Sequence, residues 1–570
     1  MTISRLLTNL LLSVLVFIMF FHPVYAITQD LGRHLLLGQI ITQTHTVPKT
    51  NLFSYTNPNY PFINTHWFSE VLFYSVERMG GFFGLLLFTS MVGAAAFLIQ
   101  LSYVKKYKVV PAIFSALLYF RILLERTDLR PEIFSFFFLS IFIVVLYKYR
   151  SGFTKWIFIL PFVELLWVNT HIYFPVGILL LGLFLIDNLI TQRKKINNKH
   201  IITLVAVIIA SVITTLFNPN TLQGAFYPLH VFQNYGFSVE ENYNVFAIWQ
   251  SFQQKSTILY FFITVLLLFI ALLSTIRKTK PVDWFLAVFF TIFAASAERN
   301  LPLFVFGTFI SFTRSFDILY GNFFPHTKER SNRKIALYLV IGIFTVWQTK
   351  DIISFKPVGF ELPIGASNAV DFLQRNSISG PIFNNFDIGS YLAYRLYPKE
   401  KVFVDGRPEA YPVSFFQNNY IPIQQDKAKF VQAETKYHFS AIVFSYTDPT
   451  PWTQTFLRDI IASPQWRMVY LDSLVIILVK NSPENQHIKS YTILNSAQFS
   501  QSKLTKDELI KLLLFYQNIG WTNEMKIVDH KLLELDPNFC YALRDLAILL
   551  HNDNNPEYVP YATKYQNSCL

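Results

Sequence analysis

Polar and ionisable residues gather in short segments between the long apolar runs of this sequence. Carboxylates, guanidinium groups and imidazoles in such segments can transfer a proton, bind a phosphate or hold sugar hydroxyls. Ionisable groups beside apolar spans are costly unless they are paired or in water, so we interpret the segments as parts of one shared polar site. The alternative, ordinary interfacial loops, accounts less well for their mixed charge and histidine content. The residues are Asp30, Arg33, His34, Asn64, His66, Glu70, Asp128, Arg130, Asn169, His171, Asn218, Glu298, Arg299 and Asn300.

The apolar runs that position these residues predict a polytopic α-helical membrane protein. Hydrophobic residues make up 52% of the chain and charged residues 15%, whereas a soluble globular chain usually carries about 25% charged residues. We expect about eleven spans, some short enough to tilt or re-enter. The first run ends in Val24-Tyr25-Ala26, which could be a signal cleavage site, but its length favours an uncleaved span. The runs lie near 6–26, 82–101, 110–124, 132–147, 156–169, 173–190, 201–217, 257–276, 283–297, 300–316 and 335–348.

Basic residues indicate which ends of the spans face the cytoplasm, because Lys and Arg in short loops are retained on that side. Alternate loops carry basic clusters such as 193–199 and 277–280, while the other set carries the mixed polar residues. An odd number of spans then places everything after about residue 349 outside the cytoplasm. The net charge of +12 therefore reflects membrane orientation, and we expect no nucleic-acid partner.

After the last span, the hydrophobic pattern predicts an α/β domain. Helical stretches near 366–375, 388–396 and 452–462 alternate with strand-like segments at 381–383, 401–404, 440–444, 467–471 and 474–479. Asp405 and Arg407 follow one such segment, where open α/β sheets place ligand-binding residues. The alternative is an internal salt bridge that braces the turn at Gly406. We divide the chain into a bundle at 1–348 with outer loop 27–80, an α/β domain at 349–480, a linker at 481–503 and a tail at 504–570.

The tail is expected to be helical. Leu533 to Asn538, followed by Ala542 and Leu546, is similar to the junction between tetratricopeptide repeats. Stacked repeats usually need about three units to be stable, so we expect this tail to pack on the α/β domain or to bind a protein partner. Cys540 and Cys569, both in the tail, can form a disulfide outside the cell or remain two buried thiols.

Several motifs together resemble bacterial GT-C membrane glycosyltransferases of the protein-mannosyltransferase-like kind. The likeness extends over most of residues 1 to 480. It is carried by the first outer loop and by polar motifs that flank later spans. These are Asp30 with Gly32-Arg33-His34, Val47-Pro48, Asn51-Leu52-Phe53-Ser54-Tyr55-Thr56, His66-Trp67-Phe68-Ser69-Glu70, Arg130-Pro131-Glu132, Leu166-Trp167-Val168-Asn169-Thr170-His171, Asn218-Pro219, Glu298-Arg299-Asn300 and Val404-Asp405-Gly406-Arg407.

The resemblance implies sugar transfer from a polyprenyl-phosphate lipid at the outer face, with a first-loop carboxylate as general base. Asp30 matches the base position, although Leu31 follows it where the superfamily often has a second acid. Arg130, Arg299 and Arg33 are the candidates for binding the phosphate. His34, His66 and Glu70 are expected to bind substrate or to help hold a divalent metal. Asn169, His171, Asn218, Asn300, Asp405 and Arg407 complete the expected substrate-binding set.

Each of the main candidates also has a purely structural interpretation. Asp30 precedes a helical run and can act only as its N-cap. His66 and Glu70 are four residues apart, so they can form a local pair on one helix face. Arg130 can be an interfacial anchor, and Asn218-Pro219 can simply end a helix.

The leading functional hypothesis is a glycosyltransferase of the bacterial plasma membrane, with an extracytoplasmic C-terminal domain. It would modify an envelope glycan, lipid or protein. The alternative is a noncatalytic envelope-assembly scaffold that recruits partners through residues 504–570. A transporter is disfavoured, because the sequence shows no matched pair of Gly/Pro-broken spans in two halves.

Overall fold

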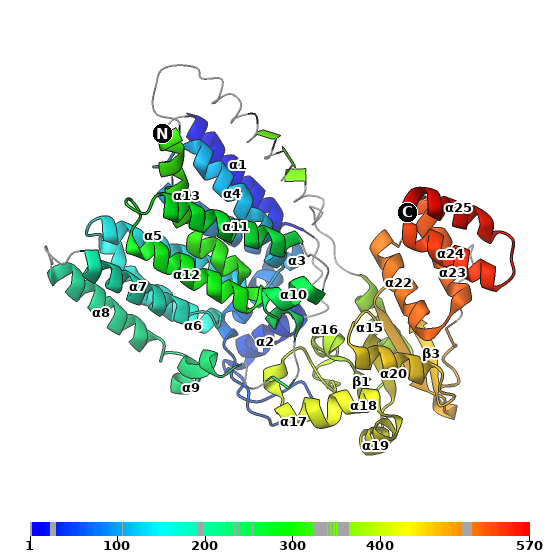
Figure 1. Ribbon diagram of the computed structural model, residues 1–570. Helices are drawn as coiled ribbons and strands as arrows, with labels where there is room; N and C mark the ends of the chain where they lie inside the picture. The colour runs from blue at the N-terminus through cyan, green and yellow to red at the C-terminus, as the bar shows by residue number, and fades with distance from the viewer. Residues whose placement is uncertain are drawn as a thin grey trace. The chain divides into compact units, whose positions relative to one another are not determined.

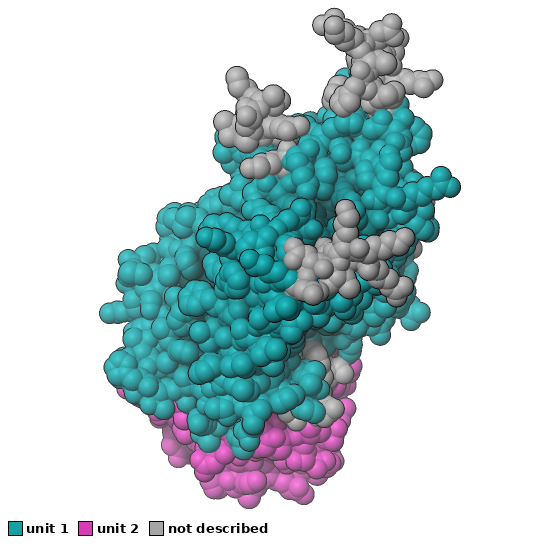
Figure 2. All heavy atoms as spheres, turned by 90° about the vertical axis from the view of Figure 1, so that its left-hand side faces the viewer, with its two compact units in different colours: residues 1–26, 34–50, 61–362 teal, residues 27–33, 51–60, 363–570 magenta. Residues whose placement is uncertain are grey.

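The computed structural model describes residues 3–22, 30–104, 106–191, 198–231, 235–236, 239–251, 256–323, 364–491 and 504–570, and a few positions between 339 and 350. The chain forms two compact units, which Figure 2 colours separately. Unit 1 contains residues 1–26, 34–50 and 61–362, and unit 2 contains residues 27–33, 51–60 and 363–570. Two pieces of the early loop thus belong to the same unit as the C-terminal domain.

Unit 1 is a helical bundle (Figure 1). Every predicted run from 6–26 to 300–316 overlaps one of its helices, while most of 335–348 and the residues Val24-Tyr25-Ala26 lie outside the described residues. The helices are α1 Ile3–Phe20, α2 Leu31–Thr44, α3 Trp67–Val104, α4 Val109–Leu123, α5 Glu132–Ser151, α6 Leu160–Thr170, α7 Pro175–Thr191, α8 Asn198–Thr214, α9 Thr221–Phe226, α10 Val245–Ser251, α11 Ser256–Ser274, α12 Pro281–Ser296 and α13 Leu301–Phe323. The first residues of α2 group with unit 2.

The bundle has the apolar composition of a membrane protein. In the part of the chain that the structure describes, four segments are long and apolar enough to cross a membrane: Trp67–Val104, Glu132–Ser151, Ser256–Ser274 and Glu298–Phe323. Shorter apolar helices are found at Asn9–Phe20, Pro175–Thr191, Lys199–Thr214 and Pro281–Ser296. Ile202 and Ile209 of α8 and Leu266 of α11 are more than half exposed, as suits contact with lipid. The figure of about eleven spans stays a prediction.

A kink divides α3 into a polar and an apolar part. Gly81 has a φ of 63°, a backbone conformation that is costly for a residue with a Cβ. The segment before Gly81 carries Glu70, and the segment after it coincides with the predicted run 82–101. The kink therefore lets one long helix contribute both to the polar network described below and to the apolar bundle.

Unit 2 contains a small mixed sheet. Its strands are β1 Ile382–Asn384, β2 Ala441–Ser445, β3 Trp466–Leu471 and β4 Val475–Lys480, in the order β1-β2-β4-β3. β1 pairs with β2 in parallel, and β4 is antiparallel to both β2 and β3. β2 is buried throughout and β4 is buried except at Lys480, because both faces of the sheet are covered. The helices of this domain are α15 Ile364–Arg375, α16 Phe386–Leu396, α17 Val413–Phe415, α18 Ile421–Gln425, α19 Lys427–Tyr437 and α20 Pro451–Ile461.

The expected strand at 401–404 is wrong. Only Val402 makes bridges, to Ile382 and to Ser54. Side chains satisfy the neighbouring backbone groups instead of a ladder: Asn384 accepts from the Phe403 amide and donates to the Val404 carbonyl, at 2.9 and 2.7 Å. Ser54 and Thr56 donate to the Phe403 carbonyl. The segment is therefore an extended connection tied to the early loop, and the argument from a strand end for Asp405 and Arg407 does not apply.

The tail is helical, as predicted. It consists of α22 Lys506–Ile519, α23 Thr522–Leu535, α24 Cys540–Asn552 and α25 Tyr558–Cys569. It packs on the α/β domain, since Asn518 donates to the Gln454 carbonyl at 2.9 Å and the rings of Phe515 and Tyr446 are 4.7 Å apart. Its membership of the tetratricopeptide class stays a prediction.

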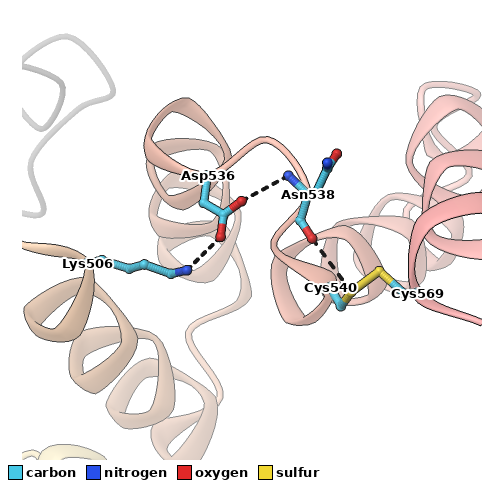
Figure 3. The surroundings of a disulfide bond; sticks show 5 residues. All are labelled: Lys506, Asp536, Asn538, Cys540 and Cys569. Carbon is cyan, nitrogen blue, oxygen red and sulfur yellow. Dashed lines mark hydrogen bonds and ion pairs between the residues drawn. A yellow bond between two sulfur atoms is a disulfide. The ribbon is translucent and has the colours of Figure 1, made fainter. Parts of the chain in front are cut away.

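Cys540 and Cys569 form a disulfide, so the alternative of two free thiols is wrong. The bond joins the start of α24 to the end of α25 (Figure 3). Next to it, the carboxylate of Asp536 accepts from the Lys506 ammonium group at 2.6 Å and from the Asn538 amide at 3.2 Å. The predicted repeat junction is thus a turn held by Asp536.

Candidate functional site

The carboxylate of Glu70 joins three segments of unit 1. Glu70 lies in the first turn of α3 and is fully buried. His34 Nδ1 of α2 lies 2.9 Å from Oε1, and Asn64 Nδ2 donates to Oε2 at 2.6 Å. Gly38 of α2 packs directly on the Glu70 backbone, so a side chain at that position would clash. Glu70 therefore has partners from outside its own helix and is not limited to a local pair with His66.

Three histidines form a chain next to Glu70. The ring centroids of His34 and His66 are 5.6 Å apart, and those of His66 and His171 are 5.2 Å apart. His171 Nδ1 lies 2.9 Å from Ser135 Oγ. Burial lowers the pKa of His171 well below its usual value, and the charges of His66, Arg299 and Arg126 lower it further. His171 is therefore neutral and can accept or donate a hydrogen bond through its ring nitrogens.

The end of α6 is fixed by polar contacts. Trp67 Nε1 donates to Asn169 Oδ1 at 2.7 Å, and Asn169 Nδ2 donates to the carbonyls of Leu165 and Phe217. Asn218 instead bonds its own turn: its amide donates to the Thr215 and Thr221 carbonyls at 2.7 and 2.8 Å. This pattern agrees with the helix-stop interpretation of Asn218.

An arginine cluster lies at the other end of the network. Arg126, in the short 3-10 helix η2 Leu124–Arg126, donates to both oxygens of Glu132 at 3.0 Å. Its third donor contacts Glu241, from η6 Glu240–Asn242. Arg130 donates to the same oxygen of Glu241 at 2.8 Å. Partial burial alone would raise the pKa of Glu241, but Arg126, Arg130 and Arg299 hold it well below its usual value. Glu241 is therefore a carboxylate at neutral pH.

Arg299 connects the arginines to the histidines. It lies in the 3-10 helix η7 Glu298–Asn300, and it donates to the Tyr173 hydroxyl at 3.1 Å and to Asn242 Oδ1 at 3.0 Å. The Tyr173 hydroxyl donates to Asn300 Oδ1 at 2.7 Å, and the Tyr173 ring is 4.7 Å from the ring of His171. Side chains from α2, α3, α5, α6 and the loops before α10 and α13 thus form one continuous polar network.

Asp30 and Arg33 lie in unit 2. Asp30 directly precedes α2 and forms an ion pair with Arg33 at 3.2 Å. Its carboxylate also borders Gly406, whose missing side chain leaves room for it, since a Cβ there would lie 3.3 Å from Asp30 Oδ1. Desolvation raises the pKa of Glu409 in the same unit, and the charge of Arg33 opposes this rise. The Asp30 side chain is partly exposed, and its basic partner Arg33 lies three residues later in the chain.

Asp405 and Arg407 form the predicted internal salt bridge. The Nε–H group and one terminal N–H group of Arg407 donate hydrogen bonds to the two carboxylate oxygens of Asp405, at 2.7 and 2.8 Å. Both side chains are fully buried, and Arg407 also donates to Asn51 Oδ1 at 2.8 Å. The Arg407 guanidinium lies 4.6 Å from the Phe53 ring centroid. The pair therefore braces the turn around Gly406 and ties it to the early loop.

The structure brings the predicted residues together in two groups. The network in unit 1 contains His34, His66, Glu70, Arg130, Asn169, His171, Arg299 and Asn300, and unit 2 holds Asp30, Arg33, Asp405 and Arg407. Sequence reasoning missed the parts played by Arg126, Tyr173 and Glu241. Arg126 stands only four residues before Arg130, and Glu241 is an acid in a predicted outer loop, so a search of those loops for counter-charges would find both.

The structure does not support the divalent metal site suggested for His34, His66 and Glu70. Among the described residues, no three His, Cys, Asp or Glu side chains are placed to hold a metal ion.

Known proteins resemble this chain in fold. No protein-family model matches the sequence, and no curated protein does. The Archaeoglobus fulgidus oligosaccharyltransferase AglB, solved with an inhibitory peptide and a dolichol-phosphate, has a TM-score of 0.56 at 10% identity, covering 94% of this chain and 86% of that chain. An Archaeoglobus fulgidus oligosaccharyltransferase in the apo form has a TM-score of 0.53 at 9% identity, covering 79% and 71%. The chain has the GT-C fold. The superfamily resemblance drawn from the sequence is thereby confirmed at the level of fold.

A third GT-C structure is also similar. The arabinofuranosyltransferase AftD from Mycobacteria has a TM-score of 0.46 at 13% identity, covering 84% of this chain and 40% of that chain.

Proposed function

We propose that this chain is a membrane glycosyltransferase that transfers a sugar from a polyprenyl-phosphate-linked donor to an envelope glycan, lipid or protein. The observation that carries the proposal is the cluster of Arg126, Arg130 and Arg299 within a GT-C fold. Guanidinium groups hold phosphate oxygens in pairs and stay charged at a membrane surface. The neighbour AglB was solved with a dolichol-phosphate, which is a lipid phosphate of this class.

The reaction breaks the bond between the anomeric carbon and the donor phosphate oxygen. An acceptor hydroxyl forms the new bond to that carbon and loses its proton to a base, while the bond electrons leave with the lipid phosphate. The arginines would stabilise the charge that develops on the departing phosphate. Tyr173, which bonds both Arg299 and Asn300, would keep this side of the site in place.

Asp30 is our candidate for the base. The assignment follows from its place at the start of the first outer loop in the resemblance to GT-C enzymes and from its partly exposed carboxylate. Arg33 would orient that carboxylate. The polar side chains His34, His66, Glu70, Asn169, His171 and Asn300 are assigned to sugar binding or to positioning. Asn218, Asp405 and Arg407 have local structural roles, and substrate binding by them stays a prediction.

We also propose that unit 2 lies outside the cytoplasm of a bacterial cell, facing the envelope. The alternation of basic loops supports this orientation. The disulfide between Cys540 and Cys569 supports it independently, because disulfides persist mainly in oxidising compartments.

A scaffold function is the second candidate. Leu514, Leu535, Ile548 and Val559 of the tail are each about half exposed, and exposed apolar side chains on a helical array favour a protein partner. In this alternative the tail recruits partners and the bundle only anchors it.

A lipid extract of the purified protein tests the proposal. Mass spectrometry is expected to find a co-purifying polyprenyl-phosphate sugar, and Arg299→Gln should reduce its amount. Arg395→Gln, which removes an arginine paired with Asp371 in α15 of unit 2, is the matched control and should leave the amount unchanged. Absence of any lipid phosphate from the wild type, with partner proteins that require residues 504–570, would favour the scaffold.

A further inference from the structure

We propose that Arg126 is a ligand of the donor phosphate and that Glu241 is an internal anion that the phosphate displaces. The inference rests on the proposed function, and it assigns to that function two residues outside the motifs that carry the resemblance. Its starting point is the unequal way in which Glu132 and Glu241 pair with the same guanidinium group.

Glu132 has the contacts of a permanent partner. It lies in the first turn of α5, and both of its oxygens accept from Arg126 at 3.0 Å. Its side chain is almost completely buried, with 6% exposed. A bidentate pair of this kind fixes the plane of the guanidinium and so aims its remaining donor. Glu132 is therefore a positioning residue for Arg126.

Glu241 has the contacts of an exchangeable partner. A single oxygen, Oε2, accepts both from Arg126 and from Arg130. The side chain is 25% exposed, and it is contributed by the 3-10 helix η6 in the loop before α10, not by a helix of the bundle. Arg126 and Arg130 are less exposed, at 10% and 15%, so an anion that approaches them from solvent has to compete with this carboxylate. The arginines keep Glu241 ionised, so protonation does not remove its charge at neutral pH. An incoming anion must therefore displace the Glu241 carboxylate to reach the arginines.

The change in charge fits a lipid phosphate. Departure of Glu241 removes one negative charge from beside Arg126 and Arg130. A sugar phosphodiester donor carries one negative charge and can take the place of that carboxylate, and the phosphate monoester that leaves carries about 1.5 to 2. The arginines can therefore stabilise the additional charge that develops on the departing phosphate, which is the direction that favours transfer.

Neighbouring contacts link the exchange to the rest of the site. Asn242, adjacent to Glu241, accepts from Arg299, and the Tyr243 carbonyl accepts from the Glu298 amide at 3.0 Å. Movement of Glu241 would thus release Arg299 from Asn242 while Tyr173 continues to hold it. Phosphate binding would in this way make one donor each of Arg126, Arg130 and Arg299 available together.

The test measures binding of farnesyl phosphate to the full-length protein in detergent, with farnesol as the ligand that lacks the phosphate. Glu241→Gln is expected to bind farnesyl phosphate about tenfold more tightly than the wild type, with farnesol unchanged. Glu241→Asp keeps the competing charge and should bind much as the wild type does. Glu132→Gln and Arg126→Gln should bind more weakly. Asp283→Asn is the matched control, because Asp283 pairs with Arg314 on α12 and α13, and should have no effect.

The outcomes separate this inference from the proposed function. If Glu241→Gln binds no more tightly than the wild type while Arg299→Gln still weakens binding, the exchange is refuted and phosphate recognition survives. If the wild type and all variants bind farnesyl phosphate no better than farnesol, both ideas fail. Thermal unfolding of each variant shows whether weaker binding reflects loss of folded protein, and Glu241→Gln avoids that ambiguity because a gain is expected.

Discussion

His34 Nδ1 and Glu70 Oε1 are 2.9 Å apart and join α2 to α3 at a site that excludes water. Because Asn64 donates a hydrogen bond to the second oxygen of Glu70, both carboxylate oxygens have a hydrogen-bond partner. A buried group of this kind is expensive to leave without its partner.

We therefore expect Glu70→Ala to lower the free energy of unfolding by about 1–3 kcal/mol. Thermal unfolding of the purified protein in detergent measures the change. Glu77→Ala on the same helix is the control, because Glu77 is only partly buried. Equal melting temperatures for the two variants would contradict a stabilising role for the triad of His34, Asn64 and Glu70.

Asp30→Asn should abolish sugar transfer without loss of folded protein, because an amide cannot take the acceptor proton. Transfer is followed with a radiolabelled lipid-linked sugar in membranes. Asp371→Asn, which removes a carboxylate paired with Arg395 in the same unit, should retain activity. Full transfer by Asp30→Asn would rule out its role as the base and leave only a structural role for this residue, such as its ion pair with Arg33.

Sidedness can be tested by cysteine labelling. The two natural cysteines are joined in a disulfide, so an introduced thiol is labelled without background. Thr46 and Arg277 are both exposed. Thr46→Cys should react with a membrane-impermeant maleimide from outside the cell, and Arg277→Cys only after the membrane is opened. The reverse pattern would refute the orientation on which the proposed function depends.

Asp529 in α23 makes the stability of the tail depend on pH. Burial, with a further contribution from Asp545, raises the pKa of Asp529 to about 8. The folded state therefore holds a proton that the unfolded state has lost above about pH 4, so stability should fall as the pH rises from about 4 to 8. Asp529→Asn should remove this dependence. Hydrogen exchange of α23 and α24 in the full chain measures it, with Asp553→Asn as the exposed control.

The disulfide should stabilise the C-terminal helices. It closes a loop across a sequence separation of 29, for which the chain-entropy estimate is about 3.5 kcal/mol. Cys540→Ser with Cys569→Ser should increase proteolysis at α24 and α25, and reduction of the wild type should give the same pattern. Transfer activity should persist, because the proposed catalytic residues lie elsewhere. If reduction leaves proteolysis unchanged, the bond has no stabilising effect.

Much of the fold could be predicted because apolar runs and short alternating segments report directly on helices and strands. The predicted runs up to 300–316 and four of the five predicted strands correspond to elements of the structure. The exception is 401–404, where the backbone bonds to side chains of Asn384, Ser54 and Thr56. Partners that distant in sequence leave no periodic signal.

The sequence predicts which residues make up the site, but it does not predict which of their side chains pair with one another. Residue type and position in the predicted outer loops indicate His66, His171 and Arg299, and the structure places these three residues in one network. Which carboxylate faces which arginine depends on the path of the loops, so Glu241 was not singled out. The bracing role of Asp405 and Arg407 was foreseen, because an Asp-Gly-Arg turn allows its two charged ends to meet.

The early loop has a consequence for biosynthesis. Asn51, Phe53 and Ser54 are fully buried in unit 2, yet the ribosome makes them some three hundred residues before β1. During translation these side chains lack their final neighbours until Val402, Phe403 and Arg407 have emerged from the ribosome. Folding of the C-terminal domain is therefore a late event that recruits a segment made much earlier, and a chain that stops before residue 363 would leave that segment without its neighbours and open to proteolysis.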